Sequence, residues 1–283
     1  MAQRTSPTER QKRLGAELHK MRVAAGVSAE AVASLLGVDR SKISNMERGL
    51  RAISPERLRS WACHCACPDG AYVDALAEMA ESSSPGWWER YRGVLPGKLL
   101  DISELEAHAV RLKTAHTVHI PGLLQTVDHA RTIFEVAVPA LPQRELEARL
   151  VHRLERQQVL VKEGAPDYHG IVHEAALRMQ FGGRAVARAQ LEHLLNMSEL
   201  SHVTLNVLPV SGGAFPGAGQ TLVYAEGPVP QLDTAQTDST HGPEFLYAEA
   251  QLSKYRAQLE WMERLSLGPD ESRAFIHEIA RQL

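Results

Sequence analysis

The chain has 283 residues, 44% of them apolar, and its formal net charge is −3 at pH 7. This length and composition predict a globular chain of one large domain or two of ordinary size. Nowhere do eighteen apolar residues follow one another, and the N-terminus has no charged segment followed by an apolar run, which argues against membrane spanning and secretion. The odd number of cysteines suits a reducing compartment, so we expect a cytoplasmic protein.

Charge is distributed unevenly along the chain. Residues 1–70 contain 12 Lys and Arg against 7 Asp and Glu, whereas the remaining residues contain 19 against 27. The first part therefore carries about +5 and the rest about −8. This asymmetry is typical of a small nucleic-acid-binding module joined to a body with another task.

The first part of the chain shows helical periodicity in short segments. Residues 13–26 carry one apolar stripe, which predicts a first helix that ends at Gly26. Ser28 has the character of an N-cap for a second helix, and Gly37 ends that helix after two turns. A third helix is predicted in VDRSKISNMERG, and Ser54 with Pro55 begins a fourth.

The spacing of small and apolar residues in the second and third helices predicts a helix-turn-helix. That motif needs a small residue where the helices touch, a glycine at the turn, and apolar residues that lock the helices together. These needs are met in order by Ala33, Gly37, Val38, Ile43 and Met46. The alternative is an ordinary small helical bundle whose exposed face is polar.

With those residues buried, the opposite face of the third helix is polar and basic. It presents Arg40, Ser41, Ser44, Asn45 and Arg48. Arginine pairs with guanine, asparagine with adenine, and serine with either base, so we expect this face to contact base edges of a double-stranded DNA operator. At the edge of the contact, phosphates are expected to be neutralised by Lys42, Arg48 and Arg51.

The stretch SAEAVASLLGVDRSKISNMERG resembles the helix-turn-helix of Xre-type and phage repressors, and the resemblance covers residues 11–67. In that family the second helix usually begins with a glutamine that touches DNA, whereas this chain has Ala29 there. The expected base readout therefore shifts to the third helix. The resemblance also implies a partly buried ion pair between Arg22 and Glu47, the alternative being two solvated side chains.

The stretch MAESSSPGWW marks a boundary between two parts of the chain. We expect a flexible N-terminal arm at residues 1–10, a helix-turn-helix domain at 11–81, a linker at 82–86 and a second domain at 87–283. In the second domain, Ser103 and Glu106 have the spacing of a capping box, which predicts a helix that starts there. Further helices are predicted at 121–137, 142–161, 247–266 and 270–282.

Short runs rich in Val, Leu, Tyr and Thr predict strands in the second domain. They are GIVHEAAL, HVTLNVLP, QTLVYAEG and PEFLYAE. Together they predict a small, mainly antiparallel sheet. The expected fold class is therefore an all-α N-terminal helix-turn-helix domain followed by a larger α+β domain.

The second domain also resembles a known group of proteins. The segments WWERYRGVLPGKLLDISELEAHAVRL, HIPGLLQTVDHAR, RLERQQVL and VTLNVLPVSGGAFPG occur in the order found in actinomycete regulators similar to WhiJ, often called antitoxin-like. The resemblance implies a regulator with no known enzymatic activity whose C-terminal domain binds a small partner protein that modulates DNA binding. The chain departs from that pattern in YAEGPVPQLDTAQTDSTHG.

Three patterns bear on enzymatic or metal chemistry. YHGIVHEAAL brings His169, His173 and Glu174 together, but Leu177 stands where a zincin has its second histidine. SGGAFPGAG lacks the Lys and Ser or Thr of a phosphate-binding P-loop, which favours a turn between strands. In CHCAC, residues 63–67, alternate spacing directs the thiols to different faces of a helix. We therefore expect no metal, no cofactor and no enzymatic activity.

These patterns together predict a sequence-specific transcriptional regulator that is nucleoid-associated when bound to DNA. We expect a homodimer, because one short recognition helix covers only a few base pairs and operators usually pair two half-sites. Two alternatives remain open. One is a regulator that responds to a small molecule held in an apolar pocket, and the other is an enzyme tethered to DNA.

Overall fold

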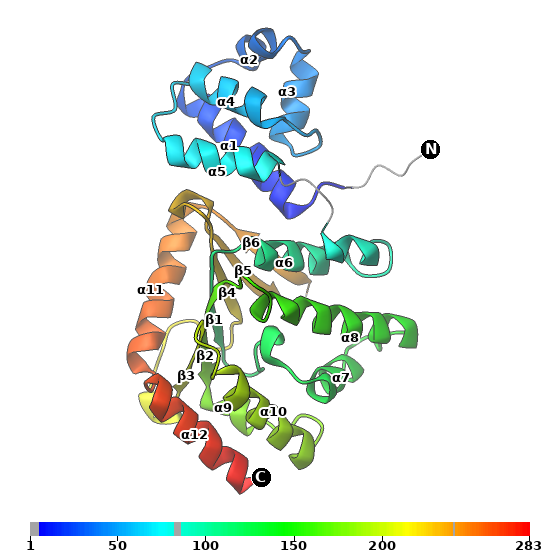
Figure 1. Ribbon diagram of the computed structural model, residues 1–283, viewed down its shortest axis with the longest axis vertical. Coiled ribbons are helices and arrows are strands. Elements are labelled where there is room, and N and C mark those ends of the chain that lie inside the picture. Colours follow the sequence, from blue (N-terminus) through cyan, green and yellow to red (C-terminus); the bar gives the residue numbers. More distant parts are fainter. Residues whose placement is uncertain (1–5, 82–85, 240) are drawn as a thin grey trace. The chain divides into compact units, whose positions relative to one another are not determined.

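The computed structural model of the chain describes residues 6–81, 86–239 and 241–283 (Figure 1). The chain divides into two compact units, which we call unit 1 (Met1–Glu89) and unit 2 (Arg90–Leu283). Half of the predicted arm at 1–10 and most of the predicted linker at 82–86 fall outside the described residues, because residues 1–5 and 82–85 are not among them. Within the described part of the arm, the first helix already begins at Glu9.

Unit 1 consists of short helices in the predicted order. They are α1 (Glu9–Ala24), α2 (Ala29–Leu36), α3 (Arg40–Glu47), α4 (Pro55–His64) and α5 (Gly70–Glu81). The starts of α1, α2 and α4 are fixed by Thr8, Ser28 and Ser54, each of which accepts a hydrogen bond from the backbone amide three residues later. Local sequence therefore sets where these helices begin.

Helices α1 and α3 approach each other closely because two glycines lie between them. A Cβ atom on Gly15 would lie 2.6 Å from the backbone oxygens of Met46 and Glu47. Gly49, just after α3, has a left-handed backbone with φ of +70°, and a Cβ there would lie 2.6 Å from the carbonyl oxygen of Gln11. Real Cβ contacts are never this short, so glycine is required at both positions.

A buried polar contact joins α1 to α5. The Tyr72 hydroxyl donates to Glu17 Oε2 at 2.5 Å, and Arg13 Nη2 lies 3.0 Å from Glu17 Oε1. Burial is the main cause that raises the pKa of Tyr72, and the hydrogen bond to Glu17 raises it further. The hydroxyl therefore stays protonated and remains a donor. The contact fixes the last helix of unit 1 against the first.

Unit 2 is built on a six-stranded sheet with the order β3-β2-β1-β4-β5-β6. The strands are β1 (Arg111–His116), β2 (Asp167–His173), β3 (Val203–Leu208), β4 (Leu222–Glu226), β5 (Thr234–Ser239) and β6 (Gly242–Leu246). The pairs β1–β2 and β2–β3 are parallel, whereas β1–β4, β4–β5 and β5–β6 are antiparallel.

The prediction of a small, mainly antiparallel sheet is therefore wrong: the sheet is mixed. Its parallel half arises because helical crossovers connect β1 to β2 and β2 to β3, and parallel neighbours need such long connections. Two strands escaped prediction altogether. These are β1, which follows the helix predicted to start at Ser103, and β5, whose sequence TAQTDS has only one apolar residue.

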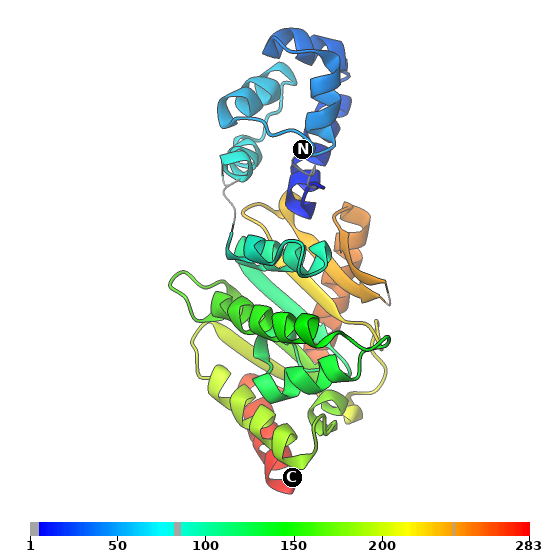
Figure 2. The ribbon, with the colours of Figure 1, turned by 90° about the vertical axis from the view of Figure 1, so that its right-hand side faces the viewer.

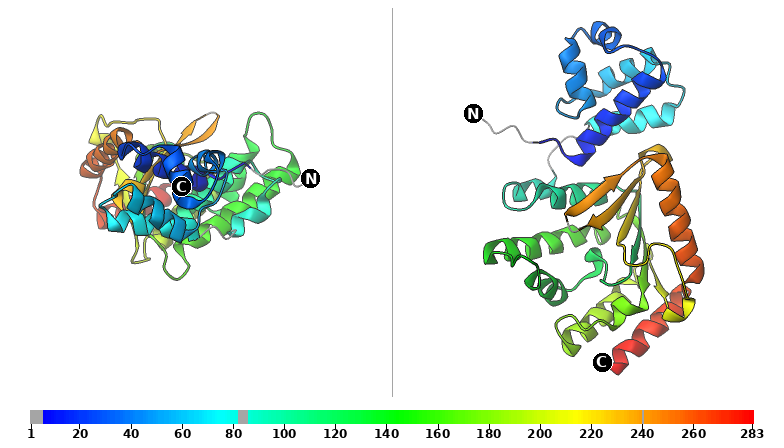
Figure 3. Two further views of the ribbon diagram at one scale, coloured as in Figure 1. Left: turned by 90° about the horizontal axis from the view of Figure 1, so that it is seen from above. Right: turned by 180° about the vertical axis from the view of Figure 1, so that it is seen from behind.

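Helices cover both faces of this sheet. Helices α6 (Gly97–Ala107), α7 (Val127–Glu135), α8 (Gln143–Gln157) and α10 (Arg184–Met197) lie on one side, as Figure 2 shows looking onto that face. Helix α11 (Glu249–Leu265) lies along the other side, as the right-hand view of Figure 3 shows, and α12 (Pro269–Gln282) packs on α10 and β3. Unit 2 is thus a three-layer arrangement with an apolar core on each side of the sheet.

The predicted helix start at Ser103 is also wrong. Helix α6 begins at Gly97, and both Ser103 and Glu106 lie inside it and are buried. Ser103 Oγ lies 3.0 Å from His152 Nε2, while Glu106 pairs with Arg156 of α8. The capping-box spacing thus reflects two contacts to a distant helix instead of a local cap. The strand predicted in GIVHEAAL ends at His173, where α9 (Glu174–Arg178) begins.

Candidate nucleic-acid interface

Helix α3 presents a polar face to solvent and an apolar face to the interior of unit 1. Ile43 and Met46 are buried. On the other side, Arg40, Ser41, Ser44 and Arg48 are exposed, as is Arg51 in the turn that follows, while Lys42 and Asn45 are half-buried. All of the residues predicted to contact DNA thus lie in or directly after one two-turn helix, which is short enough to fit one segment of a major groove.

The turn before α3 has the geometry that a helix-turn-helix requires. Gly37 ends α2 in the left-handed conformation, with φ of +60° and ψ of +40°. The amide of Val38 donates to the carbonyl oxygen of Ala33 at 2.9 Å, which satisfies a carbonyl at the end of α2. Ala33 is buried, so a small residue stands where α2 meets its neighbours.

Two of the cationic side chains on the α3 face have acidic neighbours. Arg40 Nε lies 3.0 Å from Glu30 Oε1 of α2, and these side chains are 72% and 59% exposed. Lys42 Nζ lies 3.2 Å from Asp39 Oδ2. Because exposed pairs of this kind contribute about 0–1 kcal/mol, giving up the carboxylate for another anionic partner costs either cation little. The sequence does not predict Glu30 as a partner of Arg40, since the two residues lie ten positions apart on different helices.

Arg22 and Glu47 form a two-pronged ion pair behind this face. Arg22 Nε donates to Glu47 Oε1 at 2.6 Å and Nη2 to Oε2 at 3.1 Å, with side chains 13% and 10% exposed. His19 Nδ1 lies 2.9 Å from Oε2, and Arg22 Nη1 donates to the carbonyl oxygen of Val27. The pair connects α1, the α1–α2 turn and the end of α3, so it orients the helix that carries the polar face.

The electrostatics of this pair favour the charged forms. Burial by itself raises the pKa of the Glu47 carboxyl, but the hydrogen bonds from Arg22 and His19 outweigh it and hold that pKa below its ordinary value. The hydrogen bond to Glu47 raises the pKa of Arg22. Both groups are therefore ionised across the physiological pH range.

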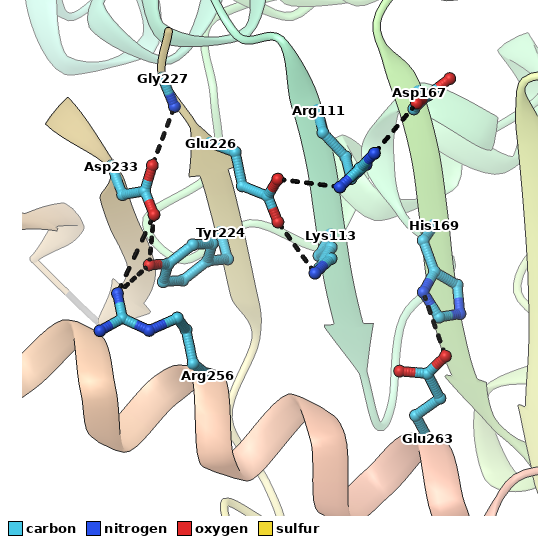
Figure 4. Close-up of polar contacts among 10 residues, drawn as sticks. All are labelled: Arg111, Lys113, Asp167, His169, Tyr224, Glu226, Gly227, Asp233, Arg256 and Glu263. Atoms are coloured by element: carbon cyan, nitrogen blue, oxygen red, sulfur yellow. Dashed lines mark hydrogen bonds and ion pairs between the residues drawn. The ribbon is translucent and has the colours of Figure 1, made fainter. Parts of the chain in front are cut away.

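Unit 2 carries a polar network on the sheet face that packs against α11 (Figure 4). The Tyr224 hydroxyl donates to Asp233 Oδ2 at 2.8 Å and accepts from Arg256 Nη1 at 2.7 Å, while the Gly227 amide donates to Asp233 Oδ1. Burial and the bond to Asp233 raise the pKa of Tyr224, and burial raises the pKa of Asp233. These bonds fix the β4–β5 turn and α11, which is a structural role.

The two histidines that the sequence offers as possible metal ligands, His169 and His173, have other hydrogen-bond partners. His169 Nε2 lies 2.7 Å from Asn206 Oδ1, and its Nδ1 lies 3.9 Å from Glu263 of α11 (Figure 4). His173 caps α9 by accepting from the amide of Ala175. Across residues 6–81, 86–239 and 241–283, no group of three or more His, Cys, Asp or Glu side chains is placed to hold a metal ion. None of the helices in these ranges is long and apolar enough to span a bilayer.

Two family models match the chain. A helix-turn-helix domain matches residues 13–76, and a domain of unknown function, DUF5753, matches residues 99–278. Neither a curated protein nor a solved structure gives a match. The first match indicates a DNA-binding regulator, and the second spans most of unit 2.

Proposed function

Since the chain belongs to the family of the domain of unknown function DUF5753 and carries a helix-turn-helix domain ahead of it, we propose that it is a sequence-specific transcriptional regulator controlled through unit 2. In this role the protein acts in the cytoplasm, is associated with the nucleoid when it is bound to DNA, and catalyses no reaction through either unit. The observation that carries it is the exposed polar face of α3 in a helix-turn-helix with the required turn.

In this proposal the side chains of α3 have two kinds of role. Arg40, Ser41, Ser44 and Asn45 read base edges in the major groove, because their donors and acceptors match those of guanine and adenine. Lys42, Arg48 and Arg51 neutralise phosphates and set the position of the helix. The separation into base-reading and phosphate-contacting residues is supported by the positions of two exposed arginines, Arg40 at the start of α3 and Arg51 beyond its end.

The proposal includes a two-fold dimer and a small partner protein bound by unit 2. A single two-turn recognition helix reads too few bases for a specific operator, so two half-sites are needed. Support for the partner comes from the resemblance of the body to WhiJ-like, antitoxin-like regulators of the Xre type. A stable complex of this kind buries about 800 Å² on each side, which a unit of this size readily supplies.

Operator binding is tested by sequencing the DNA fragments that co-purify with the protein and by measuring affinity for the enriched site and for a random duplex. Arg40→Ala is expected to cost about 1–3 kcal/mol on the operator and to relax sequence preference, whereas Arg51→Ala weakens both duplexes alike. Arg59→Ala, which removes an exposed arginine paired with Asp74 of α5, is the matched control. Equal losses on both duplexes for Arg40→Ala exclude it from base readout.

The partner is tested by capture from native extract with the immobilised full chain, followed by titration of any captured small protein into the operator assay. A partner that shifts operator affinity supports the proposal, because a ligand moves an equilibrium only by its differential affinity for the two states. If no captured protein changes operator affinity and a metabolite does, the small-molecule alternative takes its place.

A further inference from the structure

Two arginine side chains of α8 converge on one point in the interior of unit 2. A Cβ atom on Gly122, in the short helix η2 (Gly122–Leu124), would lie 2.8 Å from Arg153 Nη1 and 2.9 Å from Arg156 Nη2. Both guanidinium groups thus border the space that a side chain at Gly122 would fill. Two like charges this close repel each other unless negative charge lies beside them.

In the part of the chain that the structure describes, only one of the two guanidinium groups has a carboxylate in direct contact. Arg156 Nε lies 2.7 Å from Glu106 Oε2, with side chains 11% and 2% exposed. Among the described residues no carboxylate forms an ion pair with Arg153. Its Nη1 donates to the amide oxygen of Gln125 at 2.5 Å, and its guanidinium lies 5.1 Å from the ring centre of Phe134. Arg153 as a whole is half-buried. Burial, together with the charge of Arg156, lowers its pKa to about 9, although the more distant carboxylates of Glu106 and Asp238 act in the opposite direction.

Two buried histidines in the same electrostatic neighbourhood lack hydrogen-bond partners. His129 of α7 is 1% exposed, and neither ring nitrogen has a partner in the described structure. His116 of β1 is 7% exposed, and its Nδ1 has none either. Burial is the main cause that lowers the pKa of His129 to about 4 and that of His116 to about 3, and His119 and the nearby arginines of α8 act in the same direction. Both rings are therefore neutral at physiological pH and each offers one N–H donor.

Aromatic contacts connect the buried His129 to an exposed histidine. The exposed ring of His119 lies 5.2 Å from that of Phe181, and the buried ring of His129 lies 5.3 Å from the same phenylalanine. His119 interacts electrostatically with both buried histidines and with Asp238. The exposed His119 and the buried His129 thus contact the same phenylalanine.

Such an arrangement is costly for a protein with nothing bound in it. A buried polar group without a partner costs about 1–3 kcal/mol, and native interiors rarely leave one. Ordered water would satisfy the histidine nitrogens, but it would leave Arg153 without an anionic group in direct contact, since Glu106 and Asp238 act on it without forming an ion pair. A small anion satisfies the nitrogens and the charge together.

We propose that unit 2 binds a small oxyanion, the phosphate or carboxylate group of a metabolite, between Arg153, Arg156 and the unpartnered nitrogens of His116 and His129. Because Gly122 has no Cβ, both guanidinium groups can lie against its backbone, close enough together for one anion to accept hydrogen bonds from both. This site goes beyond the proposed function and does not depend on it, because it concerns a ligand of unit 2 and not DNA.

The test uses the full chain and two probes, sodium phosphate and sodium succinate, each compared with sodium chloride at equal ionic strength. Thermal melting and isothermal titration calorimetry at pH 7.5, about one unit above the ordinary histidine pKa, report binding. We expect a saturable rise in the melting temperature of unit 2 with at least one probe. A phosphate response assigns a phosphorylated metabolite, and a succinate response assigns a carboxylate.

Variants decide whether the response comes from this site. Arg153→Gln is expected to raise the half-saturating concentration about tenfold or more. His129→Phe, which keeps a ring against Phe181 and removes both nitrogens, is expected to act in the same direction and covers the case in which Arg153→Gln fails to fold. Arg188→Gln, an exposed arginine of α10 paired with Glu192, is the matched control and should respond like the parent. The proposal is overturned if neither probe exceeds chloride, or if a folded site variant responds like Arg188→Gln.

Discussion

Replacing Glu47 by alanine should destabilise unit 1 by about 3 kcal/mol or more, because the change leaves the Arg22 guanidinium buried without its counter-charge. The magnitude follows from the contacts. The carboxylate accepts two hydrogen bonds from Arg22 and lies 2.9 Å from His19 Nδ1, and both members of the pair are at least 87% covered. After the substitution Arg22 keeps its bond to the carbonyl oxygen of Val27 and its contact with His19 Nδ1 at 3.2 Å, neither of which supplies a negative charge. Exposed pairs are worth about 0–1 kcal/mol, so the two cases are separable.

The measurement is urea unfolding of the full chain, with hydrogen exchange of the α3 amides to assign the transition to unit 1. Arg59→Ala serves as the control, because Arg59 Nη1 lies 2.7 Å from Asp74 Oδ1 but the side chains are 52% and 71% exposed. The double variant Arg22→Met with Glu47→Leu should recover most of the loss, since it leaves no charge stranded. If Glu47→Ala costs no more than Arg59→Ala, the pair does not hold α3 in place and the reasoning is refuted.

Three further changes test other parts of the fold. The free energy of unfolding of unit 2 should fall as pH decreases from about 6.5 towards about 4, because the unfolded chain binds protons on His116, His129 and His152 in this range and the folded chain does not. The loss should be up to about 1.4 kcal/mol per pH unit for each of these histidines, and acid titration monitored by circular dichroism checks it. Gly15→Ala should cost about 1–3 kcal/mol in urea unfolding, although alanine favours a helix by about 1 kcal/mol, since its Cβ meets backbone atoms of α3. Glu106→Gln should cost about 3–5 kcal/mol in the same assay by stranding Arg156.

The helices of unit 1 were predictable because their determinants are local. Ser28 and Ser54 cap the helices that follow them, and Gly37 supplies the left-handed residue of the turn, all within a few residues of the structure they determine. The polar face of α3 follows from the same spacing, since burial of Ile43 and Met46 leaves only one side for the basic residues. The sequence therefore predicted this arrangement closely.

Unit 2 was less predictable because its polar residues have distant partners. Ser103 and Glu106 have the spacing of a helix start, yet their contacts are His152 and Arg156, about fifty residues along the chain. Strand β5 is similar: its Gln236 is polar yet buried, and β5 lies inside the sheet because it pairs with both β4 and β6, which a pattern of local residues does not indicate. Periodicity reports which residues share a face, but it does not report which polar groups meet across the interior.

The polar interior of unit 2 shows the same limit, and it also provides a test of regulation. Gly122 lies in η2 whereas Arg153 and Arg156 lie in α8, so their close approach cannot be derived from spacing. If an oxyanion in this interior controls DNA binding, the two affinities are coupled. An anion that changes operator affinity by some factor must have its own affinity changed by the same factor when operator is present. Titrating the anion with and without a saturating operator duplex therefore separates two cases. Unequal half-saturating concentrations identify a regulatory ligand, and equal ones identify an anion that only completes the core.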